Sequence, residues 1–121
     1  MVKMYNTLNL DENFGARIGR KKECIIQVND DISKAISAYL VVSIWSGESD
    51  DGKIHALGIN GKILAECPGK LHDWAFLRIP VPLDWLKTGD NVFFIYSETE
   101  GHALEVNYPG PSLLIRFSRV N

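Results

Sequence analysis

The sequence lacks the long apolar runs and the charge excess that would assign a chain to a membrane or to nucleic acid. No run approaches the roughly 18 apolar residues of a transmembrane helix. Lys and Arg number 13 against 15 Asp and Glu, a formal net charge of −2 over 121 residues, whereas phosphate binding draws on a basic excess. We therefore expect neither a membrane-spanning protein nor a nucleic-acid partner.

The chain also has little cysteine and nothing at its N-terminus typical of a signal peptide, because residues 1–6 turn polar at once. The compartment stays open, and it is extracellular if the chain is a module excised from a secreted enzyme. Cys24 and Cys67 can form one bridge or be two buried thiols, and two cysteines do not decide between these. With 45% hydrophobic residues in 121, the chain suffices for one domain over residues 1–121 with a real core.

What is present is a regular alternation of short β-rich runs and turns. Turn residues recur every 8–12 positions, which is typical of an all-β sandwich or barrel. In the clearest strand, 35–45, Ile36, Leu40 and Ile44 share one face. Asn60-Gly61 predicts a two-residue hairpin, and residues 83–86 predict a single helical turn. The expected strands are 23–28, 35–45, 53–59, 62–66, 74–79, 91–97, 103–108 and 113–120, with Pro109-Gly110-Pro111 as a turn between the last two.

If consecutive strands reverse direction, the positions of the loops follow from counting. Loops 46–52, 67–74 and 98–102 then fall at one end of the sandwich, which we call the rim. The three histidines, His55, His72 and His102, lie at or just below it. Because rigid sandwiches commonly carry their function on loops at one end, the rim is the candidate binding site.

The rim combines aromatic rings with carboxylates and imidazoles, a mixture that suits a sugar. The C–H face of a sugar ring packs on an aromatic ring, while its hydroxyls need donors and acceptors at fixed positions. The alternative for the tryptophans is that they fill the mouth of the core. The predicted ligand-binding residues are Trp45, Glu48, Asp50, Asp51, His72, Trp74, Glu98, Glu100 and His102.

Catalysis has weaker support. The histidines show no His-x-His or His-x-x-x-His spacing, so a catalytic zinc or iron site is not indicated. His55 alternates in step with Leu57, so we expect its side chain to be buried and hydrogen-bonded. Glu98 and Glu100 could flank a glycosidic bond, but a sandwich of this size rarely has a deep cleft. Loop 48–52 lacks the spacing of an EF-hand, so we expect no required cofactor and leave a structural Ca²⁺ open.

A second hypothesis concerns the apolar strand 91–97, where Val92, Phe94 and Tyr96 form a face that monomers seldom expose. This face could mediate a homodimer or docking onto a neighbouring catalytic domain. The alternative is that residues 2–20 fold over it. A metal-dependent enzyme is the third hypothesis.

Three stretches resemble the galactose-binding-domain-like jelly rolls, the β-sandwich group that includes many carbohydrate-binding modules and accessory domains of glycoside hydrolases. They are 34–40, the hairpin 57–62, and the 81–93 passage with its Leu-Lys-x-Gly-x-Asn corner. The resemblance covers about residues 22–120 and implies an antiparallel β-sandwich of jelly-roll topology, with sugar bound at one end and frequently a structural calcium. We therefore predict a non-catalytic carbohydrate-binding module whose partner is an oligo- or polysaccharide.

Overall fold

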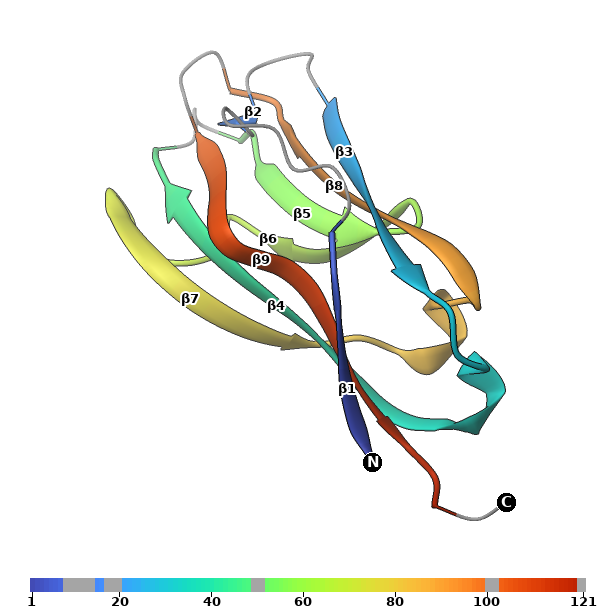
Figure 1. Cartoon of the computed structure of the whole chain (residues 1–121). Helices are drawn as coiled ribbons and strands as arrows, with labels where there is room; N and C mark the ends of the chain where they lie inside the picture. The colour runs from blue at the N-terminus through green and yellow to red at the C-terminus, as the bar shows by residue number, and fades with distance from the viewer. Residues whose placement is uncertain (8–14, 17–20, 49–51, 100–102, 120–121) are drawn as a thin grey trace.

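The computed structural model describes residues 1–7, 15–16, 21–48, 52–99 and 103–119, and it is a sandwich of two β-sheets (Figure 1). Neither short helix in these ranges is long enough to cross a membrane. The elements are β1 (Val2–Asn6), β2 (Gly15–Ala16), β3 (Lys21–Val28), η1 (Ile32–Lys34), β4 (Ala35–Ser46), β5 (His55–Ile59), β6 (Lys62–Glu66), β7 (Asp73–Pro80), η2 (Leu83–Trp85), β8 (Gly89–Ser97) and β9 (Leu104–Phe117).

The strand order confirms the predicted all-β jelly roll. Sheet A has the order β1-β9-β4-β7, with β2 also paired to β9, and sheet B has the order β3-β8-β5-β6. All the pairings are antiparallel. Most neighbours are far apart in the sequence, because the chain crosses repeatedly between the sheets, as a jelly roll requires.

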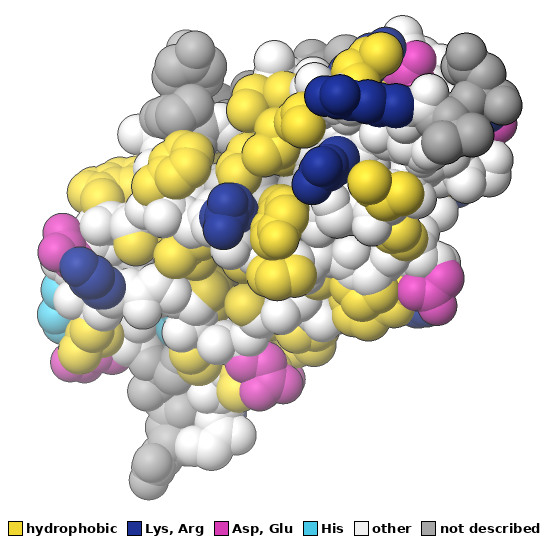
Figure 2. All heavy atoms as spheres, turned by 90° about the horizontal axis from the view of Figure 1, so that it is seen from below, with side chains coloured by type: hydrophobic (Ala, Val, Ile, Leu, Met, Phe, Trp, Pro, Cys, Tyr) yellow, Lys and Arg dark blue, Asp and Glu magenta, His cyan; other side chains and the backbone are white. Residues whose placement is uncertain are grey.

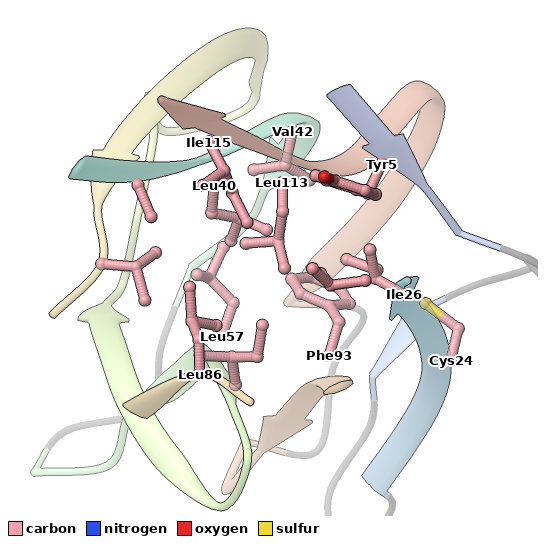
Figure 3. Packing of buried hydrophobic residues seen from close by; sticks show 14 of the residues in the cluster. Tyr5, Cys24, Ile26, Leu40, Val42, Leu57, Leu86, Phe93, Leu113 and Ile115 are labelled. Carbon is pink, nitrogen blue, oxygen red and sulfur yellow. The ribbon is translucent and has the colours of Figure 1, made fainter. Parts of the chain in front are cut away.

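The core lies between the sheets and follows the predicted alternation (Figure 3). Leu40 and Val42 of sheet A face Leu57 and Phe93 of sheet B, and all four are fully buried. Ile36 is an exception at 55% exposure. The pairing of β4 with β9 shifts between Ala35 and Ser37, so Ile36 falls out of the inward register that simple alternation predicts.

The last predicted turn is wrong. Residues 104–117 form one strand, and Pro109-Gly110-Pro111 is an irregularity within it, at the point where the pairing with β4 shifts between Val41 and Ser43. Gly110 has φ 102°, and a Cβ there would lie 2.8 Å from the Val41 carbonyl oxygen. The prolines therefore bulge the strand against β4 and do not reverse the chain.

The hairpin prediction at Asn60-Gly61 is confirmed. Asn60 and Gly61 join β5 to β6 with φ values of 50° and 79°, the two positive φ angles that a type I′ turn needs. The Asn60 side chain also donates to the Asn91 Oδ1 atom at 2.9 Å, which ties the hairpin to the corner before β8.

Both cysteines are free thiols. Cys24 is buried on β3, and Cys67 is exposed in the loop after β6, so they do not form the bridge left open by the sequence. Burial raises the pKa of the Cys24 thiol. No disulfide therefore joins the described residues, and the fold is stabilised by non-covalent contacts between them.

A contact between three side chains ties β1 to the loop after β3. The Tyr5 hydroxyl donates to Asp30 Oδ2 at 2.5 Å, and Lys3 Nζ lies 3.1 Å from the same oxygen. The hydrogen bonds from Tyr5 and Lys3 lower the pKa of Asp30. Burial, followed by the interaction with Asp30, raises the pKa of Tyr5. The contact is therefore strongest while Asp30 is charged and Tyr5 is neutral.

We expect Tyr5→Phe to cost most stability between roughly pH 5 and pH 9. As the pH falls through the lowered pKa of Asp30, the wild type loses the part of its unfolding free energy that the charged Asp30 carboxylate contributes. Above about pH 10 unfolded tyrosine ionises while folded Tyr5 stays neutral, so the wild type also loses stability as the pH rises. Urea unfolding at acid, neutral and alkaline pH measures the difference. Asp30→Asn should remove the loss of stability at acid pH and reduce the loss at alkaline pH without abolishing it, because burial alone still raises the pKa of Tyr5. A difference constant across pH would contradict this account.

Candidate functional site

The rim exists as the counting of strands predicts. β4, β6 and β8 end there, and β5, β7 and β9 begin there. The loops are tied together by backbone hydrogen bonds, from the His72 amide to the Ser46 carbonyl at 2.7 Å and from the Gly47 amide to the Ala103 carbonyl at 2.8 Å. The described parts of the three predicted loops therefore meet at one end of the molecule.

His55 lies at the base of this end, buried as its parity predicts. It is 1% exposed, and its Nε2 atom lies 2.8 Å from the Ser46 Oγ atom. Burial lowers the pKa of His55, which favours a neutral imidazole at pH 7. The pair borders a hollow of about 360 Å³, which we call the rim hollow; its lining residues are Ser46, Gly47, His55, Cys67, Gly69 and Leu71.

The two rim tryptophans lie on the outer face of sheet A and not in the mouth of the core. Trp45 of β4 pairs directly with Trp74 of β7, so their side chains stand side by side on the same face. Trp74 is 44% exposed, and neither ring belongs to the buried core. The His72 ring stacks on Trp45 with centroids 6.1 Å apart and planes at 28°. These three residues form what we call the aromatic platform.

Of the predicted carboxylates, the structure describes Glu48 and Glu98. Glu98 follows β8 in sheet B, and its Oε1 atom accepts a hydrogen bond from the Ile54 amide at 3.1 Å, so it supports the neighbouring loop. Glu48 is exposed beyond the end of β4. The remaining predicted residues, Asp50, Asp51, Glu100 and His102, lie outside the described residues.

Sequence reasoning missed the continuation of the platform along β7. Phe76 is 61% exposed and Arg78 is exposed, and both alternate with half-buried inward residues. The Arg78 guanidinium carbon lies 4.7 Å from the Tyr39 ring centroid on β4. The period-2 pattern of Trp74, Phe76 and Arg78 is the signal that could have shown this exposed line.

The described residues contain no group of three or more His, Cys, Asp or Glu side chains placed to hold a metal ion. Most of the acidic loop 48–52 lies outside the described residues. A structural Ca²⁺ there therefore stays a prediction.

The apolar face proposed for assembly is less open than expected. Phe94 is only 4% exposed; its ring stacks with Tyr96 at 6.4 Å, and Lys21 Nζ lies 4.6 Å above it. The N-terminal strand does not cover this face, because β1 belongs to sheet A. The large hydrophobic side chains exposed on the described strands of sheet A are instead Val2, Met4, Ile36, Trp74 and Phe76.

The fold defines the class of this protein: an antiparallel β-sandwich like that of the galactose-binding-domain-like group. A β-porphyranase of glycoside hydrolase family 86 from the human gut bacterium Bacteroides plebeius matches 99% of this chain with a TM-score of 0.66 and 18% identity, and the match spans 21% of the enzyme chain. A family 35 carbohydrate-binding module from an environmental isolate matches 94% of this chain and 92% of its own length, with a TM-score of 0.52 and 11% identity.

These likenesses establish the β-sandwich fold and confirm the resemblance in fold to a carbohydrate-binding module and to part of a glycoside hydrolase. No protein-family model matches the chain. A search of curated proteins finds no significant relative.

Proposed function

We propose that this domain is a non-catalytic carbohydrate-binding module that holds its glycan on the aromatic platform. The observation that carries the proposal is the cross-strand pair Trp45–Trp74, with Trp74 44% exposed at the rim. A large aromatic ring left in solvent on a rigid strand gives a sugar a flat apolar surface at little entropic cost.

Two neighbouring features suit the platform to a sugar. His72 stacks on Trp45 and so limits the motion of that ring. The rim hollow begins next to it, because Leu71 lines the hollow and the His72 amide is bonded to Ser46. A ring stacked on Trp74 therefore has polar groups nearby for its hydroxyls, and we expect micromolar to millimolar affinity, about 8 down to 4 kcal/mol.

The similar structures support this proposal because both come from proteins that act on or bind carbohydrates. One is itself a carbohydrate-binding module of nearly the same length, and the other is an enzyme of which this fold makes up about a fifth. We extend the proposal to a neighbouring catalytic domain as a partner. A screen with calcium and with chelator tests whether loop 48–52 takes part.

We expect Trp74→Ala to weaken glycan binding about tenfold or more, because the stacking surface is lost, without unfolding the exposed edge strand. A screen of plant, algal and microbial polysaccharides finds the ligand, and calorimetric titration measures the change in Kd. Ile63→Ala is the matched control, since Ile63 is 39% exposed on β6 of the other sheet. Unchanged binding in both Trp74→Ala and Trp45→Ala would exclude the platform.

A further inference from the structure

The aromatic platform is one end of a longer exposed surface on the outer face of sheet A. Trp74, Phe76 and Arg78 follow each other on alternate positions of β7, over about 13 Å from first to last. Arg116 projects from the same face on β9, opposite Val2 of β1. Figure 2 shows this side, with hydrophobic side chains over much of it, Lys and Arg side chains between them, and Asp and Glu around the edge.

The two arginines of this face lack acidic partners among the described residues. The ion pairs found there join Lys3 to Asp30 and Lys21 to Glu23. Arg78 lies instead over the Tyr39 ring, with 4.7 Å between the guanidinium carbon and the ring centroid. This contact holds the planar guanidinium in place while its N–H donors stay open to a ligand.

An arginine that has no acidic partner in the described part of the chain and lies beside exposed aromatic rings is suited to a ligand that has both apolar faces and negative charge. Guanidinium groups bind sulfate and carboxylate oxygens with two parallel hydrogen bonds, which add geometric specificity as well as electrostatic attraction. The rings of Trp74 and Phe76 supply stacking surfaces on the same strand. The line from platform to arginine is long enough for more than one sugar unit.

We propose that the outer face of sheet A binds an acidic polysaccharide, with sugar rings on Trp74 and Phe76 and sulfate or carboxylate groups at Arg78 and Arg116. This inference rests on the proposed carbohydrate-binding function and adds the charge class of the ligand. The proposed binding site is then the outer face of sheet A, beginning at the rim, and is not limited to the rim loops.

Charge complementarity separates this ligand from other occupants. A second copy docked on the same face by a two-fold axis would bring the Arg78 and Arg116 side chains of both copies into one interface, and burying like charges is costly. A nucleic acid would need a larger basic excess than this chain has, at a net charge of −2. An acidic glycan needs only spaced cations between stacking surfaces.

The test measures Kd of the full chain for neutral polysaccharides and for the chemically sulfated and carboxymethylated form of each. We expect at least one anionic form to bind about tenfold or more tightly than its neutral parent at low salt, with the advantage shrinking as salt rises. The double variant Arg78→Gln/Arg116→Gln should lose this advantage, so that the anionic and neutral forms bind with about equal affinity. The sulfated and carboxymethylated arms show which anion the arginines prefer.

The matched control is Lys21→Gln/Lys62→Gln, which removes the same charge from cations over the Phe94 and Trp85 rings, outside this face. It should keep the anionic preference. Neutral glycans bound without any preference would overturn the inference and leave the proposed function standing, whereas no binding to any glycan would remove both. An arginine double variant that keeps the preference for anionic glycans would also overturn the inference. Equal affinity for a single-stranded oligonucleotide would overturn it as well, and so would self-association of the chain that Phe76→Ser abolishes.

Discussion

Gly58→Ala is expected to destabilise the domain by about 3 kcal/mol or more, the upper end of what overpacking a well-packed site costs. A Cβ at Gly58 would lie 2.1 Å from the Lys62 carbonyl oxygen and 2.6 Å from the Phe94 Cζ atom. The first of these is backbone and cannot rotate away. The β5–β6 hairpin would have to open, and Phe94 would have to leave the ring position that covers β5.

Urea unfolding monitored by tryptophan fluorescence measures the loss. Gly61→Ala is the matched control, because a Cβ there meets nothing within 4 Å and only its φ of 79° is unfavourable, so about 1 kcal/mol is expected. Adding Phe94→Leu to Gly58→Ala should recover only part of the loss, since the clash with the Lys62 carbonyl remains. A Gly58→Ala protein as stable as the wild type would show that the hairpin moves freely.

The second large effect is expected from Asn91→Asp, at about 4 kcal/mol of unfolding free energy, from several buried hydrogen bonds lost at once. Asn91 is fully buried at the start of β8. Its Oδ1 atom accepts from the Lys87 amide at 3.0 Å and from the Asn60 side chain at 2.9 Å. Its Nδ2 atom donates to the Lys87 carbonyl at 2.9 Å and to the Gly89 carbonyl at 3.2 Å.

An aspartate at position 91 would turn an oxygen toward the two carbonyls that now accept from the amide. Two acceptors would then face one another in a buried site, and a charge would be left without a cation. Asn29→Asp makes the same chemical change at an exposed position and should change stability by less than about 0.5 kcal/mol. Thermal and urea unfolding of both variants decide the point, and equal stabilities would show that the Asn91 network contributes little.

The alternation of side chains along single strands was predictable, because it depends only on the local geometry of an extended chain. It placed Leu40 and Ile44 in the core and His55 below the rim, and it failed at Ile36, where a shift in pairing with β9 interrupts the register. Asn60-Gly61 was equally local, since the turn needs only two residues that tolerate positive φ.

The Pro-Gly-Pro segment could not be interpreted from its own residues. Such a segment can end a strand or bulge it, and the outcome depends on the strand beside it. Here β4 continues past the segment and pairs with β9 on both sides, so the strand bulges and goes on. The rim was still predicted correctly, because the loops that form it all precede that error along the chain.

With Ile36 as the exception, the sequence by itself therefore determined which side chains share a strand face and which loops share an end, because both follow from local periodicity and from the reversal of consecutive strands. Only the tertiary structure decided that Trp45 and Trp74 stand together on sheet A while Glu98 follows a strand of sheet B. In a jelly roll, the neighbours of a strand come from distant parts of the chain, and they are selected by how the two sheets bury their faces against each other.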